Sequence, residues 1–320
     1  MLKRIANLSL DLDNQWSYMK THGDPGWESF PSYLDLVVPR ILKMLDERDL
    51  CITFFLVGQD AALEKNAKVL ASIADAGHEI GNHSFHHEPW LHLYSEEQVH
   101  AEFEEAELAI EKATGCRTDM FRGPGFSLSP TVLRVLKDRN YRFDASTMPT
   151  YLGPLARAYY LRTAKLEGEE REKRAQLFGT WKTGLQPIKP YRWQLEAGEL
   201  LELPVTTFPV LKFPFHLSYV LYLSTFSSAL ASFYFRSALR ACRLARFGPS
   251  LLLHPLDFLS HEDVQNLDFF PGMKIPLIKK LQRVGHYLDL YQQAFDVKAM
   301  GDYALDLTQS EKPPLSKRKL

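Results

Sequence analysis

The sequence predicts an α/β protein built on a largely parallel sheet. Short apolar runs rich in β-forming residues alternate with helical segments along the first half of the chain, and these runs are too short to be helices. The length of 320 residues suits one large α/β domain. Repeated βα units of this size imply parallel pairing, in a sheet that is either open or closed.

Each expected element of the first half has its own signal. The expected strands are 5–13, 51–57, 78–82, 120–121 and 141–143. The expected helices between them begin near Pro39 and then cover 61–76, 95–114 and 130–140. Pro39 stands where a first helical turn would begin. Ser95 with Gln98 has the spacing of a capping box, which predicts the start of the third helix.

The second half is less regular, although strand-like runs return at 200–205 and 250–254. The range 151–198 mixes aromatic residues with Pro, Gly and a charged patch, which predicts an insertion or lid that buries its aromatic side chains. We expect one domain over 1–308. The tail over 309–320 is expected to be unstructured, because it is rich in Pro and Lys.

Composition excludes several classes of protein. Lys and Arg number 38 against 39 Asp and Glu, so no basic excess indicates a nucleic-acid partner. Cys51, Cys116 and Cys242 include no Cys-x-x-Cys pair, which excludes a disulfide framework and a thiolate zinc site and fits a reducing compartment. The apolar run near Met1 is too short for a signal peptide, so the expected location is the cytoplasm.

Two carboxylates end the first expected strand. Asp11 and Asp13 alternate with Leu12, so both carboxylates lie on the same face of the strand at its carboxyl end. In parallel α/β proteins, active sites form at this edge of the sheet. An acidic strand end that caps the next segment would have the same pattern.

Histidines follow the third expected strand, in the segment HSFHH over 83–87. His83 and His87 are four apart and can bring both imidazoles to one metal if the backbone turns helically. With a carboxylate from Asp11 or Asp13 they would form a three-ligand site with an open position, as in catalytic zinc and non-haem iron sites. A polar cluster without metal fits the pattern equally well. His86 is expected to have a supporting role.

Polar residues also follow three later strands. Arg122 can pair with a carboxylate of a neighbouring strand, and the glycine-rich turn after it, which includes Gly125, exposes backbone amides. Asp144 suits either a helix cap or the partner of a histidine. His254 suits acid–base chemistry, because its charge changes near neutral pH. Taken singly, Arg122 also fits a surface turn and His254 the edge of a core.

The segment 213–246 has an unusual charge pattern. Residues 213–235 contain no Asp, Glu, Lys or Arg, and Arg236, Arg240, Arg243 and Arg246 then follow at helical spacing. One interpretation is an outer helix packed on the sheet with the arginines on its solvated face. The other is a helix in peripheral contact with an anionic membrane surface. The Pro, His, Ser and Thr residues of the segment argue against a membrane span.

Taken together and in this order, these segments resemble the polysaccharide deacetylase family, the NodB-homology carbohydrate esterases. The similarity covers about residues 5–150 and 200–260, and its most specific part is AGHEIGNHSFHH over 76–87. The residues Thr53-Phe54-Phe55 also resemble the family's second strand. The resemblance implies a distorted, TIM-like (β/α)7 barrel with an inserted lid, which binds one divalent metal and hydrolyses N-acyl groups on sugars.

The resemblance also implies roles for the acidic and histidine residues. Asp13, His83 and His87 match the metal ligands, with zinc as the expected metal, and Asp11 matches the catalytic base. One departure lies here, because Leu12 separates two aspartates that are adjacent in the commonest form of the family.

The remaining roles fall on the later strand ends. Arg122 matches the arginine that holds the base, His254 the general acid, and Asp144 the carboxylate that orients this acid. A backbone amide near Gly125 would stabilise the oxyanion, and Phe126 stands one place after the usual sugar-contacting residue. Pro255 follows His254 where the family often has Asp, which leaves Asp257 as another acidic neighbour.

We therefore expect a metal-dependent hydrolase that removes an N-acetyl or N-formyl group from a sugar, with a cytoplasmic or lipid-linked glycan intermediate as substrate. One alternative is a hydrolase of small non-sugar amides or imides, similar to allantoinase, on the same fold. Another is a catalytically silent carbohydrate-binding relative, against which the filled acid–base positions argue. The expected location is the cytoplasm, at the cytoplasmic face of the membrane if 213–246 contacts lipid.

Overall fold

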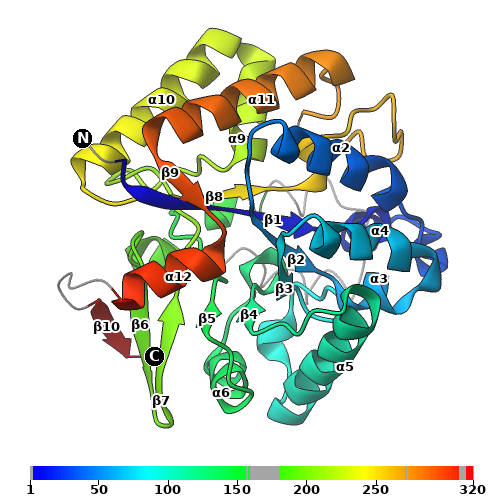
Figure 1. Cartoon of the computed structure of the whole chain (residues 1–320), viewed down its shortest axis with the longest axis vertical. Coiled ribbons are helices and arrows are strands. Elements are labelled where there is room, and N and C mark those ends of the chain that lie inside the picture. The colour runs from blue at the N-terminus through cyan, green and yellow to red at the C-terminus, as the bar shows by residue number, and fades with distance from the viewer. Residues whose placement is uncertain (1–2, 156–157, 159–180, 271, 310–314, 320) are drawn as a thin grey trace.

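A mostly parallel sheet flanked by helices forms the centre of the protein (Figure 1). The computed structural model describes residues 3–155, 158, 181–270, 272–309 and 315–319. The strands are β1 (Ile5–Leu12), β2 (Thr53–Leu56), β3 (Glu79–Asn82), β4 (Met120–Phe121), β5 (Phe143–Asp144), β6 (Tyr191–Leu195), β7 (Gly198–Glu202), β8 (Ser250–Leu253), β9 (Asp296–Lys298) and β10 (Ser316–Lys319). Their order is β10-β6-β7-β5-β4-β3-β2-β1-β8, and β9 pairs with the start of β1.

Pairing is parallel throughout this order except between β6 and β7. Strand β1 is buried from Ala6 to Leu12, as expected for a parallel strand covered on both faces. Within the described residues β8 and β10 end the order, so the strand ladder does not close. The Thr206 amide donates to the Ser250 carbonyl at 3.0 Å and links the chain after β7 to β8. The predicted α/β fold is confirmed, and the arrangement is consistent with a distorted (β/α)7 barrel.

Helices cover the outside of the sheet (Figure 1). They are α1 (Gln15–His22), α2 (Leu34–Asp46), α3 (Gly58–Ala62), α4 (Glu64–Asp75), α5 (Glu96–Thr114), α6 (Pro130–Asp138), α9 (Leu217–Phe226), α10 (Ser228–Leu244), α11 (Leu277–Ala294) and α12 (Met300–Gln309). The predicted capping box is present, because the Ser95 hydroxyl accepts from the Gln98 amide and the Gln98 side chain accepts from the Ser95 amide. Within the described residues, no helix is both long and apolar enough to cross a bilayer.

Two predicted helices differ in detail. Helix α2 begins at Leu34, so Pro39 lies inside it and not in its first turn. Pro39 is on the exposed side, where water can satisfy the carbonyl group that loses its backbone donor. The single helix expected over 61–76 is instead α3 followed by α4, because Leu63 adopts an extended conformation between them (φ −85°, ψ 115°).

The boundaries of the insertion and of the tail also differ from expectation. Strand β6 lies within the expected insertion 151–198 but belongs to the sheet, and its Tyr191 and Trp193 pack into a buried cluster with α5 and α6. Residues 156–157 and 159–180 of that range lie outside the described residues. The expectation of an unstructured tail is wrong for Ser316–Lys319, which pair in parallel with β6. The tail positions 310–314 and 320 lie outside the described residues.

The segment 213–246 forms α9 and α10, which pack against α11 at one end of the molecule (Figure 1). Ser227 separates the two helices, and its hydroxyl accepts from the Leu230 amide to begin α10. Helix α10 buries Ala231, Phe235, Ala238, Leu239 and Cys242. The interpretation of this segment as an outer packed helix is therefore correct for one face of α10.

Candidate metal and acid–base site

Strand register brings the predicted polar residues to one edge of the sheet. Leu10 of β1 pairs with Leu253 of β8, so Asp11 and His254 follow at the same level on adjacent strands. On the other side, Leu12, Leu56, Asn82 and Phe121 are in register across β1 to β4. Asp13, His83 and Arg122 each follow one of these residues. The carboxyl ends of five neighbouring strands thus meet around one site.

Asp13, His83 and His87 converge as a buried group. The Asp13 Oδ1 atom lies 2.9 Å from His87 Nε2 and 3.3 Å from His83 Nε2. Burial opposes ionisation of Asp13, but the charges and hydrogen bonds of His87 and His83 outweigh it and hold the pKa of this carboxyl well below its usual range. Tyr18, which sequence reasoning missed, donates its hydroxyl to Asp13 Oδ2 at 3.0 Å.

The backbone does not bring the two histidines together by a helix. Ser84 and His87 both adopt left-handed conformations, with φ of 63° and 52°. The Asn82 side chain accepts from the Ser84 amide at 2.8 Å, and Glu102 Oε1 accepts from the amides of Phe85 and His86 at 2.9 and 2.7 Å. These side chains hold a loop that residues other than glycine rarely adopt, as is common at functional sites.

The three side chains fit a divalent transition metal. His83 Nδ1 donates to the Arg122 carbonyl at 2.6 Å, so in the neutral imidazole Nε2 keeps its lone pair. The ligand atoms of Asp13, His83 and His87 lie within 4.8 Å of one another. Two imidazole nitrogens and one carboxylate form a set that suits zinc or another divalent transition metal. His86 lies outside this set and pairs with Glu102 Oε2 at 2.8 Å.

Arg122 is fully buried beside Asp11. Its Nη1 atom donates to Asp11 Oδ1 at 2.6 Å and to Ser9 Oγ at 2.9 Å. Its Nε atom donates to the Ala145 carbonyl at 3.1 Å, and its guanidinium carbon lies 4.4 Å from the centre of the Phe55 ring. A buried guanidinium needs this degree of pairing to be tolerated. Arg122 thus fixes Asp11 through one oxygen and leaves Oδ2 for other contacts.

His254 is held by groups from α9 and from the turn after β8. Its Nδ1 atom lies 3.0 Å from Ser218 Oγ, and its backbone amide donates to Asp257 Oδ2 at 2.9 Å. Ser218 also hydrogen-bonds the Asp257 carboxylate. Burial raises the pKa of Asp257, although the nearby His254 charge acts in the opposite direction. Sequence reasoning named Asp257 only as a neighbour and missed Ser218.

Asp144 does not occupy the place that the resemblance implied. It pairs in register with Glu202 of β7, and its Oδ1 accepts from Ser146 Oγ at 2.5 Å. Among the described residues no hydrogen bond or ion pair joins Asp144 to His254. The Ser146 hydroxyl in turn accepts from the Gly123 amide at 2.7 Å. Strand β5 pairs with β7 here, and Asp144 supports the turn after Arg122 through the Ser146 hydroxyl.

Gly125 and Phe126 lie in this turn, both with left-handed backbone conformations (φ 58° and 61°). The Phe126 amide donates to the Gly123 carbonyl at 2.9 Å, so it is not free to bind an oxyanion. For the Gly125 amide, binding of the oxyanion stays a prediction. The Phe126 side chain is half-buried, and Gly125 is exposed.

His216 is a further residue near His254 that sequence reasoning missed. The centres of the two imidazole rings are 5.9 Å apart. Burial, aided by the nearby His254 charge, lowers the pKa of His216 to about 3, so this imidazole stays neutral at working pH. Its Nδ1 atom is buried and has no hydrogen-bond partner within the described part of the chain.

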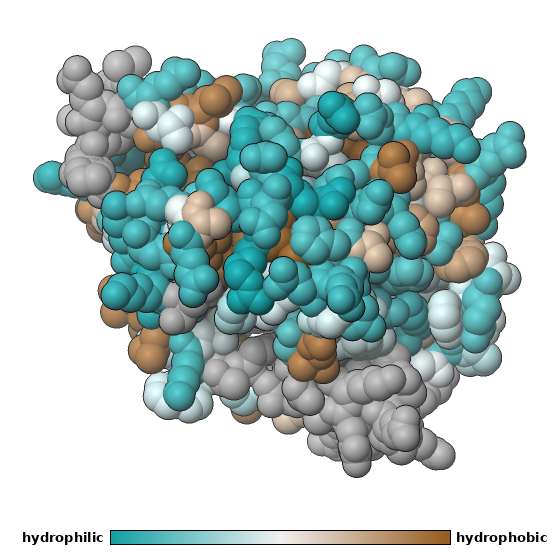
Figure 2. Space-filling model, turned by 90° about the horizontal axis from the view of Figure 1, so that it is seen from below, coloured by the Kyte–Doolittle hydropathy of each residue, from teal (hydrophilic) through white to brown (hydrophobic). Residues whose placement is uncertain are grey.

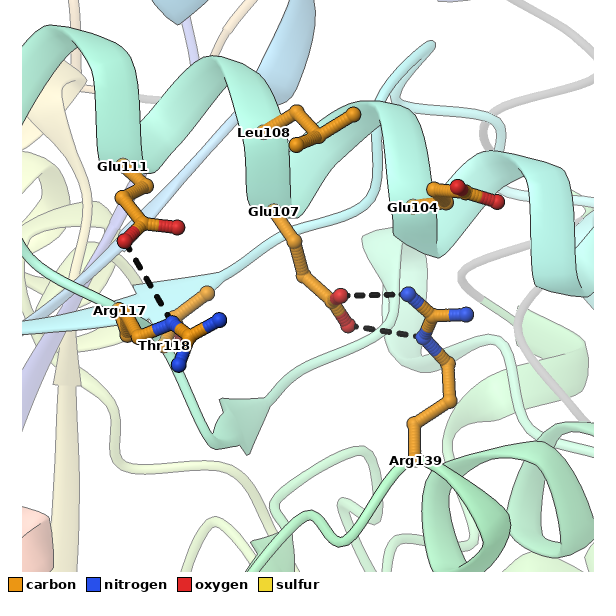
Figure 3. Close-up of a pocket in the computed structure, with 7 residues that line it drawn as sticks. All are labelled: Glu104, Glu107, Leu108, Glu111, Arg117, Thr118 and Arg139. Carbon is orange, nitrogen blue, oxygen red and sulfur yellow. Dashed lines mark hydrogen bonds and ion pairs between the residues drawn. The ribbon is translucent and has the colours of Figure 1, made fainter.

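A second hollow lies on the outer surface of α5, away from these strand ends (Figure 3). Arg139 pairs with both carboxylate oxygens of Glu107 at 3.0 and 2.6 Å, and Arg117 pairs with Glu111 at 3.4 Å. Glu107 and Glu111 are thus paired, and Glu104 is the third acidic residue of the hollow. None of the residues of the strand-end site lines this hollow.

Comparisons with known proteins support the resemblance drawn from the motifs. Residues 24–143 match the profile of the polysaccharide deacetylase family. The peptidoglycan-N-acetylmuramic acid deacetylase PdaA of Bacillus subtilis is 30% identical over 105 residues, which cover 32% of this chain and 39% of the relative. The peptidoglycan deacetylase of Helicobacter pylori is 27% identical over 125 residues, which cover 39% of this chain and 40% of the relative. The chain thus spans about two fifths of these relatives' length.

A solved structure extends the likeness of fold to nearly the whole chain. A candidate polysaccharide deacetylase from Mycobacterium smegmatis has a TM-score of 0.63 at 20% identity, and the alignment covers 98% of this chain and 93% of the other. The resemblance to the polysaccharide deacetylase family is confirmed. The matched segment contains His83, His87 and Arg122, while Asp11 and Asp13 precede it and His254 follows it.

Proposed function

We propose that this protein is a metal-dependent hydrolase that removes an N-acetyl or N-formyl group from a sugar. The observation that supports this most is the pairing of Asp11 with buried Arg122 directly beside the group of Asp13, His83 and His87. A carboxylate next to a three-ligand site, with His254 at the same level on the adjacent strand, supplies the groups that amide hydrolysis needs.

Asp13, His83 and His87 would hold the metal, and zinc fits this donor set. When bound, the metal would acidify a water molecule and polarise the amide carbonyl. Asp11 would accept the proton of the attacking water on Oδ2, because Oδ1 is occupied by Arg122. Arg122 would keep this carboxylate oriented during the reaction.

His254 would donate a proton from Nε2 to the departing amine. Its Nδ1 atom faces Ser218 Oγ, and the Ser218 hydroxyl also bonds the Asp257 carboxylate. Ser218 thereby links the His254 ring to the Asp257 carboxylate. This arrangement would fix the orientation of the ring, a positioning role that the resemblance had given to Asp144.

The named relatives act on peptidoglycan, which is an acylated glycan. For this chain we propose a smaller acyl-sugar intermediate, either free in the cytoplasm or linked to a lipid. Hydrolysis of small amides or imides, and carbohydrate binding without turnover, remain as the competing functions that the experiment must separate.

The test uses purified full-length protein, stripped by a chelator and reloaded with zinc or cobalt. Released acetate or formate and new free amine are measured on N-acetyl and N-formyl sugars, with cyclic amides as the competing substrates. We expect acyl release from sugars that depends on added metal, and loss of both metal and activity in His83→Ala and His87→Ala. Turnover only of cyclic amides, or glycan binding without turnover, would overturn the proposal.

A further inference from the structure

The turn between α9 and α10 exposes a group of large apolar side chains. The most prominent are Phe226, Leu230 and Phe233, which are 70%, 53% and 67% exposed. We call the exposed apolar residues of this region the α9–α10 tip, and they are Tyr222, Phe226, Ala229, Leu230 and Phe233.

Packing of the two helices does not account for these residues. Helix α10 already buries Phe235, Leu239 and Cys242 on the side that faces the body of the protein. Leu230 and Phe233 are three residues apart on its outer side. Large apolar side chains on a solvated face, gathered at one turn, mark a surface that contacts something other than water.

The charge around the tip has a single sign. The sequence contains no Asp or Glu between Glu202 and Asp257, a stretch with one lysine and four arginines. Arg236, Arg240 and Arg243 are exposed along α10 on the same side as Leu230 and Phe233. Among the described residues, none of these arginines makes an ion pair with an acid. The tip therefore has a basic border with unused positive charge.

The outer surface of α5 lacks this combination. Figure 2 shows a largely hydrophilic face, seen from below the view of Figure 1 and so away from α10. Leu108 on α5 is 63% exposed, but it lies among Glu104, Glu107 and Glu111. The acidic groups beside this apolar residue would be repelled by an anionic surface.

We infer that the α9–α10 tip docks on an anionic lipid bilayer. Its apolar side chains would enter the boundary between headgroups and acyl chains, and the arginines would contact lipid phosphates. A second copy of this chain is a poorer occupant. A twofold interface places the same patch on both sides, so the basic borders would face each other.

The position of the tip bears on the substrate, a step that rests on the proposed function. Ser218, which contacts His254, lies near the start of α9, and Phe226 ends this helix. Phe226 lies eight positions after Ser218, a rise of about 12 Å along the helix at about 1.5 Å per residue. Docking at the tip would hold the strand-end site close to the bilayer, where a sugar carried on a lipid can reach it.

The test is co-sedimentation of the full chain with vesicles of phosphatidylcholine alone or mixed with phosphatidylglycerol. We expect binding to the anionic vesicles at low salt and little binding to the neutral ones. The triple variant Arg236→Gln, Arg240→Gln, Arg243→Gln should weaken binding by about a hundredfold, since all three proposed contacts with lipid phosphates are lost. Phe226→Ser with Phe233→Ser should also lose binding, whereas the matched control Leu108→Ser should not.

Activity on a water-soluble acyl sugar is measured separately and should be unchanged in all these variants. Vesicle binding without hydrolysis would contradict the proposed function and leave the docking surface in place. Absence of binding to either vesicle, or equal binding by the arginine variant, would overturn docking. A dimer in sedimentation velocity that Phe226→Ser dissociates would overturn it in favour of a second copy.

Discussion

Asp11 and Asp144 are both buried aspartates at the carboxyl ends of parallel strands, yet their partners differ in charge. Asp11 of β1 meets the guanidinium of Arg122, and Asp144 of β5 meets the carboxyl group of Glu202. The first pair can remain charged, whereas the second must retain a proton, because two buried carboxylates that face each other cannot both ionise at low cost. The same residue type in the same kind of position therefore has a cationic partner in one place and an acidic partner in the other.

The largest effect should follow from Asp11→Asn. This variant removes the proposed proton acceptor but no proposed metal ligand, so turnover should fall by about 10²–10⁴-fold or more. Metal content measured by mass spectrometry should remain near that of the unmodified protein. If Asp11→Asn loses its metal and Asp13→Asn keeps it, the two carboxylates have the opposite roles.

His254→Ala should lower the maximal rate by about 10²–10⁴-fold, the usual contribution of one acid–base group. The alkaline limb of the pH–rate profile should disappear, because the proposed donor must be protonated to act. Metal content serves as the control and should not change. A rate close to that of the unmodified protein would place the general acid at another residue.

Ser218→Ala should reduce the rate by a smaller factor, about tenfold, because His254 loses the hydroxyl group that contacts its Nδ1 atom. Ser218→Thr should restore part of the rate, since it retains the hydroxyl. Ser237→Ala on α10 is the matched control, and an equal loss in both variants would contradict the positioning role.

Asp144→Asn should have the smallest effect on activity and should instead change how stability depends on pH. Burial raises the pKa of Asp144, and burial together with the Asp144 charge raises the pKa of Glu202 well above its usual range. Groups with a raised pKa in the folded state stabilise it fully at acid pH, and this contribution is lost as pH rises through the raised values. Replacing one carboxyl with an amide removes the need to hold a shared proton.

Urea unfolding between about pH 5 and about pH 9 measures this prediction. The variant should lose less stability than the unmodified protein as pH rises, because it lacks one of the two buried carboxyl groups that compete for a proton. The exposed Asp138→Asn is the control and should leave the pH dependence unchanged. A roughly hundredfold fall in turnover with an intact fold would show that Asp144 orients His254 after all.

The sequence predicted the position of a polar residue well where that residue directly ends a strand. Asp11, Asp13, His83 and Arg122 each lie at the carboxyl end of a short expected strand, and parallel register alone places such residues at one edge. Ser218 and His216 could not be found in this way, because they come from α9, whose approach to β8 leaves no periodic signal. The partner of Asp144 was missed because a motif identifies a residue but not what the next strand places opposite it.

Local signals at the margins of the sheet were also weak. Strands β6 and β10 have only five and four residues, and their pairing joins segments more than 100 positions apart. The basic tail reads as disordered by composition, and pairing with β6 overrides that reading. The start of α2 was predicted wrongly from Pro39, because a proline on an exposed helix face destabilises the helix less than a proline in the core.

The packing of Arg122 over Phe55 depends on the absence of a side chain at Gly81. Gly81 of β3 lies opposite Phe55 in the parallel register, and a methyl group there would stand 2.6 Å from the ring, closer than such atoms approach. The aromatic ring therefore occupies the space where another residue's side chain would begin, and the guanidinium rests on its other neighbours and on this ring. The orientation of Asp11 on β1 thus depends on a glycine two strands away, because Gly81 leaves room for the Phe55 ring on which Arg122 packs.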